Sequence, residues 1–171
     1  MKKIKQIIIL VAVVVLSCAL IISAHLQTKP IIKERQEKIL NERIVNIFPM
    51  MTDSHEIKED ELYEIYKDES LIGYIVIAEA YGYQSKIQVL VGFEKNMKIK
   101  KIFVLNEEET PGIGSQITED EFRSQFTGLT KESVALSDKD GEIDSVTGAT
   151  ASSKAVVEAV KNAFEVLRQS E

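Results

Sequence analysis

The sequence predicts an α+β fold, with an N-terminal transmembrane helix and a stalk helix ahead of an antiparallel sheet and a C-terminal helix. Three observations support it. Four β-rich segments follow one another between residues 62 and 105, with only short polar or glycine-bearing turns between them. Residues 150–167 carry an apolar stripe at helical spacing, and residues 7–24 form an apolar run without a charge. We therefore expect a membrane anchor over 1–27, a stalk over 28–50 and a folded domain over 51–171.

The composition narrows the function classes. Of 171 residues, 44% are hydrophobic and 28% charged, which excludes a disordered chain. Cys18 is the only cysteine, so no intramolecular disulfide can form, and no Cys/His cluster exists for zinc or an iron–sulfur centre. Redox chemistry would therefore need an organic cofactor. Beyond residue 27 the chain has 18 Lys and Arg against 27 Asp and Glu, a balance of −9, which argues against a nucleic-acid partner.

The apolar run is best interpreted as a single membrane-spanning helix. As a helix, the segment from Ile7 to Ala24 is about 27 Å long, close to the hydrocarbon thickness of a bilayer. A cleaved signal peptide would have a shorter apolar stretch, and a lipoprotein would use Cys18 behind a weak lipobox. Lysines and arginines stand on both sides of the run, so their number alone does not decide the orientation.

The next segments lead from the anchor into the sheet. Residues 30–48 have apolar positions at roughly helical spacing, with Pro30 near the start and Pro49 after the end, and predict the stalk helix. A polar stretch over 52–61 follows. The four predicted strands cover residues 62–66, 72–80, 87–93 and 99–105.

A short helix, a short strand and a long helix complete the prediction. Thr118–Glu121 resembles a capping box, so a helix should begin there and end at Gly128. A strand over 133–136 should turn at 138–141 and return through Ile143. The segment 138–141 is interpreted as a turn and not as a calcium site, because it lacks the length and the terminal glutamate of a calcium-binding loop. The last helix should run over 150–167. His25 and His55 have no partner at metal-ligand or triad spacing.

Three glycine-containing stretches are candidate ligand sites. Residues 109–115, Glu-Thr-Pro-Gly-Ile-Gly-Ser, are either a plain connector or a loop where a flat ligand or a phosphate approaches the backbone. Residues 144–153 hold five hydroxyls and one carboxylate where the last helix begins, more than capping needs, which indicates a phosphate site. Residues 81–87 place two tyrosines around Gly82, where they either edge the sheet or pack beside a planar ring.

Taken together and in this order, these motifs resemble a known family. The sequence is similar to the FMN-binding domain of two proteins, the G subunit of the Rnf electron-transport complex and the C subunit of the sodium-pumping NADH:quinone reductase. The resemblance covers almost the whole chain. It rests on the anchor, on the Glu109–Gly114 loop, on Asp144-x-x-Thr147-Gly148-Ala149-Thr150, and on Gly82-Tyr83 with Ile87 and Val91-Gly92. Ile113 stands where leucine is commoner.

The resemblance implies a covalent flavin. In that family a flavin transferase takes FMN from FAD and joins its phosphate to the last threonine of the motif, which here is Thr150. Asp144, Thr147, Gly148 and Ala149 would be recognised by the transferase, with Thr147 near the phosphate afterwards. The flavin ring would be bordered by Thr110, Gly112, Ile113 and Gly114.

The resemblance also implies a function and a location. It predicts an electron-transfer flavoprotein that serves as the G subunit of an Rnf-type ion-translocating ferredoxin:NAD⁺ oxidoreductase, one part of a complex and not a stand-alone enzyme. Its partners would be the other subunits, the flavin transferase and the cell membrane, with one transmembrane pass and the folded domain on the extracytoplasmic side. Two alternatives stay open. One is a free-standing anchored FMN carrier, and the other is a non-redox ligand-binding module in which residues 147–153 only cap a helix.

Overall fold

The computed structural model describes residues 2–58, 61–139 and 141–170, with the side chains of residues 2–3, 5–10, 12–13, 21, 24, 26–27, 29–33 and 139 outside the described set. Helix α1 runs over Lys2–Ile47 and so includes both predicted N-terminal helical segments. The chain divides into two units, Met1–Glu42 and Arg43–Glu171. Among the described residues, no helix combines the length and the apolar character needed to cross a bilayer. The predicted membrane segment, 7–24, includes side chains outside that set.

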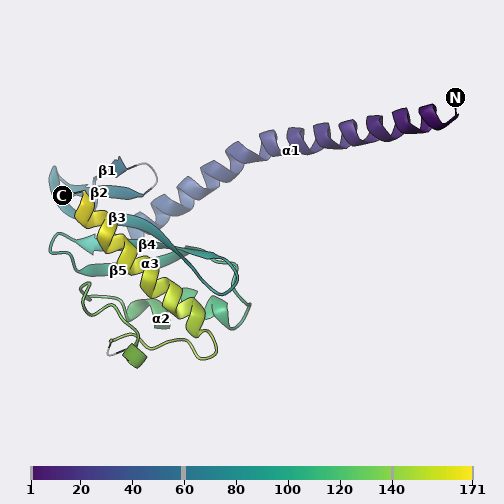
Figure 1. Ribbon diagram of the computed structural model, residues 1–171. Helices are drawn as coiled ribbons and strands as arrows, with labels where there is room; N and C mark the ends of the chain where they lie inside the picture. Colours follow the sequence, from purple (N-terminus) through teal and green to yellow (C-terminus); the bar gives the residue numbers. More distant parts are fainter. Residues whose placement is uncertain (1, 59–60, 140, 171) are drawn as a thin grey trace. The chain divides into compact units, whose positions relative to one another are not determined.

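The second unit is built on a five-stranded antiparallel meander (Figure 1). Its strands are β1 (Asp53–Lys58), β2 (Leu62–Lys67), β3 (Ser70–Tyr81), β4 (Lys86–Glu94) and β5 (Ile99–Asn106), in that order across the sheet. Strands β2 to β5 confirm the four predicted strands within a few residues at their ends. The strand β1 was not predicted, because its side chains are mostly exposed and show no apolar alternation; it is held by pairing with β2.

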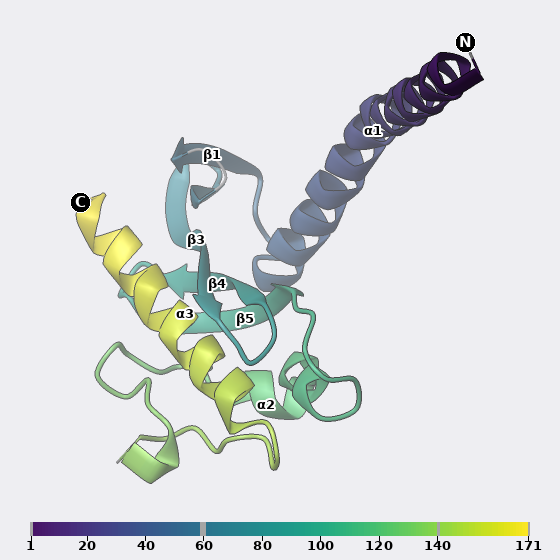
Figure 2. The ribbon, with the colours of Figure 1, turned by 45° about the vertical axis from the view of Figure 1, so that its right-hand side comes forward.

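Helix α3 (Thr150–Gln169) crosses one face of the sheet and packs on β3 and β4, as both ribbon views show (Figure 2). Its apolar stripe enters the main core, where the rings of Phe93 and Phe164 meet edge to face with their centroids 4.7 Å apart. The predicted C-terminal helix is therefore confirmed. Burial of this stripe is the main reason the helix forms, since most helical stability in proteins comes from packing an apolar face.

The other face of the sheet is covered by the last turn of α1 and by Phe48, which directly follows that helix. Two strand glycines make room for these residues: a Cβ on Gly92 would lie 2.5 Å from Ile47, and a Cβ on Gly73 would lie 2.6 Å from Phe48. Because both faces are buried, the interior strand β4 is apolar almost throughout rather than alternating.

The chain between β5 and α3 is mostly irregular. It contains the 3₁₀ helices η1 (Gly114–Thr118) and η2 (Ser137–Lys139) and the short helix α2 (Asp120–Ser124). The predicted capping box is wrong, since Glu119 is the N-cap residue of α2 without a side-chain cap, and the Thr118 hydroxyl donates to the Ser115 carbonyl instead. The predicted strand over 133–136 is reduced to a single bridge between Leu136 and Ile143.

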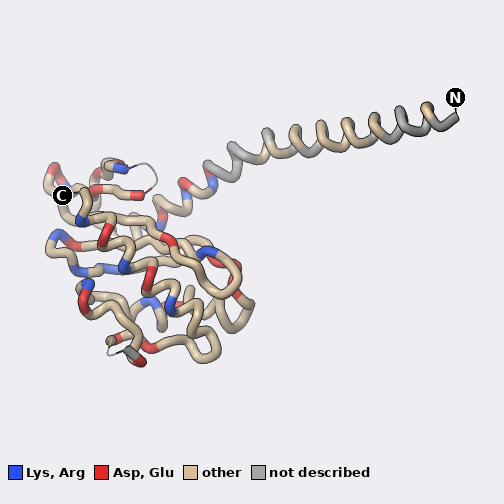
Figure 3. Tube along the Cα trace, in the orientation of Figure 1, with Lys and Arg blue, Asp and Glu red and all other residues tan. Residues whose placement is uncertain are grey.

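Acidic and basic residues are interspersed along the chain of the second unit (Figure 3). Several form ion pairs, including Lys86 with Glu79 and Lys131 with Glu165. These pairs are at least one third exposed, so each contributes little to stability. Among the described residues of this unit, Glu109 is the charged side chain that is buried.

Candidate functional site at the start of helix α3

A pocket of about 350 Å³ lies where the loop after β5 meets the first turn of α3. That volume falls within the usual range for small-ligand sites. Its lining combines two motif loops and the β3–β4 turn, and consists of Tyr83, Glu109, Thr110, Ile113, Gly114, Gly148, Ala149, Ala151 and Ser152. Tyr83 and Ile113 are 73% and 46% exposed, which leaves two apolar surfaces available to a flat ligand.

Glu109 holds the parts of this pocket together. The residue is only 5% exposed. It accepts the backbone N–H of Tyr83 at 3.0 and 3.2 Å, one bond to each oxygen, and the N–H of Gln84 at 3.2 Å. The Ser152 hydroxyl donates to its other side at 2.7 Å. One side chain therefore joins the β3–β4 turn to the first turn of α3.

These contacts also decide the charge of Glu109. Burial by itself would raise the pKa of the carboxyl, but the hydrogen bonds from Ser152 and from the turn N–H groups outweigh burial and lower the pKa below its usual value. The group is therefore an ionised carboxylate at neutral pH. Such a buried charge is tolerated because it is surrounded by donors.

Two glycines are required by the position of Glu109. A Cβ on Gly82 would lie 2.3 Å from a carboxylate oxygen of Glu109, and a Cβ on Gly114 would lie 2.6 Å from its Cβ. The motif glycines thus make room for the buried glutamate, in addition to any ligand. Gly112 differs from them, because its φ of +78° is needed for the turn and no atom lies within 4 Å of its Cβ position.

The second motif loop, residues 144–149, is held by two other side chains. The Ser153 hydroxyl accepts the Val146 N–H and donates to the Ala149 carbonyl, both at 3.0 Å. The Gln125 side-chain amide pairs with the Asp144 backbone, accepting its N–H at 2.7 Å and donating to its carbonyl at 3.4 Å. At Gly148, φ is +79°, and a Cβ there would lie 3.5 Å from Ile113, so the two loops approach closely.

The start of α3 is open. The N-cap residue is Ala149, and no side chain caps the helix. The first intrahelical bond runs from the Ser153 N–H to the Ala149 carbonyl, so the N–H groups of the first turn point out of the helix end. Thr150, the first helical residue, is exposed. An uncapped helix start beside an exposed hydroxyl is suited to a phosphate group.

A second cleft of about 500 Å³ lies between residues 144–147 of the same loop and the α2 region. It is lined by Asp144 and Thr147 together with Gln125 and Phe122 of the α2 region, among others. Asp144 and Thr147 are both exposed, so this part of the motif is accessible from solvent.

Comparison with known proteins identifies the family. Residues 82–165 match the FMN-binding domain family, a range that includes every residue of the pocket. The G subunit of the ion-translocating oxidoreductase complex of Methanosarcina acetivorans is 30% identical over 98% of this chain and 95% of its own. This chain belongs to the G-subunit family. The G subunit of the proton-translocating ferredoxin:NAD⁺ oxidoreductase complex of Clostridium ljungdahlii is 29% identical over 88% of this chain and 83% of its own.

A solved structure shares the fold of this member of the G-subunit family. The C subunit of the Na⁺-translocating NADH-quinone reductase of Parabacteroides distasonis superposes with a TM-score of 0.52, at 20% identity, over 60% of this chain and 58% of that chain. At this identity the likeness concerns the fold alone. The matches to the FMN-binding domain and to the G subunits confirm the family resemblance inferred from the motifs.

The structure distributes the predicted site residues over three positions. Thr110, Ile113, Gly114, Gly148 and Ala149 lie together around the pocket. Asp144 and Thr147 line the second cleft, while Thr150 and Gly112 are exposed and belong to the lining of neither. Their roles towards a flavin stay predictions.

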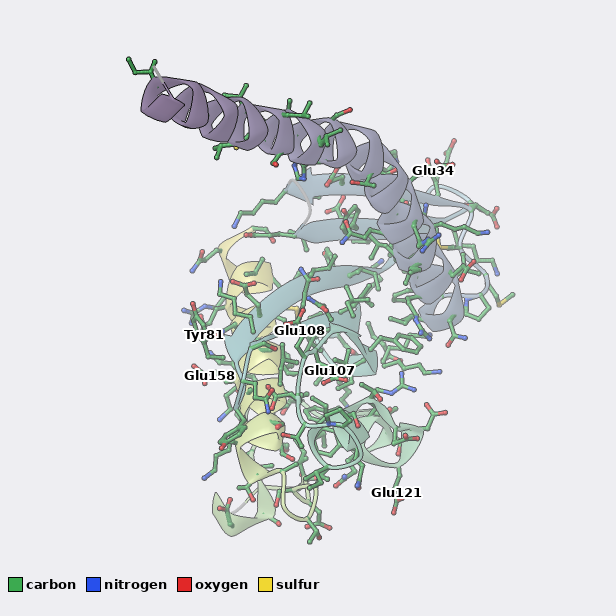
Figure 4. The ribbon with its side chains drawn as sticks, turned by 90° about the vertical axis from the view of Figure 1, so that its right-hand side faces the viewer. Glu34, Tyr81, Glu107, Glu108, Glu121 and Glu158 are labelled. Carbon is green, nitrogen blue, oxygen red and sulfur yellow. The ribbon has the colours of Figure 1, made fainter. Side chains whose placement is uncertain are left out.

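The sequence placed Glu109 and Ser152 within candidate stretches but gave neither a role in the site, and it did not indicate Gln125. Nothing in the sequence distinguishes Glu109 from Glu107 and Glu108 except its place next to the Thr-Pro-Gly turn. Figure 4 shows Glu107 and Glu108 on the segment that leads from β5 into the loop. Their side chains are more exposed than that of Glu109, so burial separates three chemically identical neighbours.

Proposed function

We propose that this chain is the FMN-carrying G subunit of an ion-translocating ferredoxin:NAD⁺ oxidoreductase of the Rnf type. The names of its relatives describe subunits of complexes with this activity in Clostridium ljungdahlii and Acetobacterium woodii. Within such a complex the protein would pass electrons between neighbouring centres, rather than act as an enzyme alone. The observation that carries the proposal is the open start of α3, with Thr150 exposed beside the glycine-lined pocket.

This geometry supports covalent attachment at Thr150. The Thr150 oxygen would attack the FMN phosphorus of FAD in the active site of a flavin transferase. The new bond is threonine oxygen to phosphorus, the bond that breaks is the pyrophosphate P–O bond, and AMP leaves while the hydroxyl proton is released to a base of the transferase. Because Thr150 is exposed and Asp144 and Thr147 are accessible, a second protein can reach this loop.

The residues of the pocket fit an FMN group. The N–H groups at the start of α3 would hold the phosphate, since the helix dipole and uncapped donors favour an anion there. Tyr83 and Ile113 offer apolar surfaces to a planar ring, and the glycines allow its close approach. The flavin, when bound, supplies electron transfer, while the protein supplies binding, orientation and electrostatics.

The remaining parts of the proposal concern location and partners. The apolar run 7–24 would anchor the chain in the cell membrane, with residues 28–50 as the stalk and the domain 51–171 on the extracytoplasmic side, where a tether prevents loss of the flavin. The other subunits of the complex and the transferase would be its partners. Carbonate extraction of host membranes tests the anchor, because an integral protein stays in the pellet whereas a peripheral one is released.

The mass of the intact protein purified from its own membranes tests the function. We expect a gain equal to FMN minus water, located by fragment mapping on the peptide that contains Thr150. An unmodified mass, in a host that attaches flavin to other proteins, would refute covalent attachment. Co-purification with the other proteins of the complex then separates a component of that complex from a free-standing carrier.

A further inference from the structure

The pocket contains one buried charged group, and its contacts suggest a role beyond that of a spacer. Glu109 is the first residue of the loop 109–114, yet its hydrogen-bond partners belong to the β3–β4 turn and to α3. Its backbone is fixed as well, since the Glu109 N–H donates to the Glu107 carboxylate at 2.8 Å. Glu109 is also one of the residues that line the pocket, so its charge lies beside the space that a ligand would occupy.

We propose that Glu109 is the positioning and potential-setting residue of this pocket. Its hydrogen bonds connect the β3–β4 turn, which contains Tyr83, to helix α3, and its negative charge makes the bound flavin harder to reduce. This inference rests on the proposed function, because it takes the flavin ring to lie in the pocket. A fixed negative charge in a site of low dielectric opposes the arrival of electrons on a neighbouring group, and this lowers the reduction potential of that group.

The partners of Glu109 make the proposal specific. The Ser152 hydroxyl partly compensates the charge at 2.7 Å, so removal of this donor should strengthen the negative field. Removal of the charge should weaken it. The two substitutions therefore shift the potential in opposite directions, which a role limited to packing does not predict.

The first experiment measures the midpoint potential of covalent FMN by spectroelectrochemical titration. The covalent tether keeps the flavin on the chain in every variant, so the potential reports the pocket rather than occupancy. Glu109→Gln is expected to give a more positive potential and Ser152→Ala a more negative one. Glu108→Gln is the matched control, because it makes the same change at an exposed neighbour, where solvent screens the charge.

The second experiment follows amide hydrogen exchange on the chain produced without the transferase, so no flavin is needed. The N–H groups of Tyr83 and Gln84 should exchange about tenfold faster in Glu109→Gln, since each loses a hydrogen bond to a charged acceptor. In Glu108→Gln they should exchange as in the parent.

The outcomes separate the inference from the proposed function. A parent chain without covalent FMN refutes the proposed attachment, while hydrogen exchange still judges the positioning part. If exchange accelerates but the potential of Glu109→Gln equals that of Glu108→Gln, the role is structural only and the proposal is overturned. If Glu109→Gln fails to fold, Ser152→Ala decides, and a potential equal to that of the parent overturns the proposal.

Discussion

The two motif loops that meet beside α3 are held in different ways. The loop 109–114 is fixed by a charge, because the buried carboxylate of Glu109 gathers donors from two distant elements. The loop 144–149 is held by neutral side chains outside it: Gln125 pairs with the backbone of Asp144, and Ser153 bonds the backbone of Val146 and Ala149. Thr147 and Gly148 within the loop, and Thr150 directly after it, are exposed.

Because the two loops are held differently, one part of the site is rigid while the other part is accessible from solvent. A wall that orients a ring needs rigidity, and buried hydrogen bonds to a charge provide it. A segment that a second protein must modify needs its acceptor hydroxyl in solvent, so only its ends are fixed. The neighbouring serines of α3 divide the two tasks, as Ser152 contacts the first loop and Ser153 the second.

The largest effect is expected where the start of α3 loses the exposed hydroxyl of Thr150. Thr150→Ala should abolish covalent FMN completely while leaving the fold intact, because the side chain is exposed and does not cap the helix. Thr150→Ser keeps the nucleophile and should remain modified. Intact mass and circular dichroism measure both. Covalent FMN on the alanine variant would show that another residue carries the flavin.

The next effect concerns the rigid loop and depends on pH. Glu109→Gln should lower the free energy of unfolding by about 1–3 kcal/mol at neutral pH, because the N–H groups of Tyr83 and Gln84 and the Ser152 hydroxyl lose a charged acceptor. The pKa of Glu109 is lowered in the folded state, so its contribution is full above the unfolded pKa and is lost as the pH falls through the folded pKa.

Denaturant unfolding at a series of pH values checks this prediction. The difference between parent and Glu109→Gln should shrink towards acid, whereas Glu108→Gln should follow the parent at every pH. A difference that stays constant with pH would mean that the charge of Glu109 contributes nothing to stability.

A smaller effect on stability is expected for alanine at Gly148 and Gly128, and comparison of the two variants separates backbone strain from a role in flavin attachment. Gly148 and Gly128 have φ of +79° and +84°, and neither has an atom close enough to clash with a Cβ. Each alanine substitution should therefore cost a similar amount, about 1–2 kcal/mol. Thermal unfolding should show equal losses, but only Gly148→Ala should slow flavin attachment, since Gly128 lies outside both motifs. Equal attachment rates would argue against a role for Gly148 in modification.

The smallest effects should come from the two glutamine side chains that contact the loops. Gln125 pairs with the Asp144 backbone, and Gln84 donates to the Thr110 hydroxyl at 3.1 Å. Each alanine variant should lose about 0.5–1 kcal/mol of stability. Gln125→Ala should slow transfer to Thr150 in a timed assay with transferase and FAD, and Gln84→Ala should not. Slowing by both would mean that the loops act as one unit.

Much of the fold could be predicted from local patterns. Strands β2 to β5 and helix α3 follow from apolar periodicity, because burial of one face or stripe drives their formation. The strand β1 could not be predicted, since its mostly exposed residues owe their conformation to pairing with β2. The expected strand over 133–136 did not form, and the close approach of Gly141 to Ala135, with a Cβ position 2.0 Å from the Ala135 carbonyl oxygen, shows a tight turn in its place.

The sequence alone determined the order of the elements, the two glycine-containing loops and the concentration of hydroxyls at the start of the last helix, because these depend on residues that are neighbours in the chain. Which of the three glutamates is buried, and which serine of α3 contacts which loop, depends on how distant segments pack together. Tyr83 and Ser152 are 26 and 43 residues from Glu109. Their convergence results from packing α3 on the sheet, and no local pattern encodes a contact over that separation.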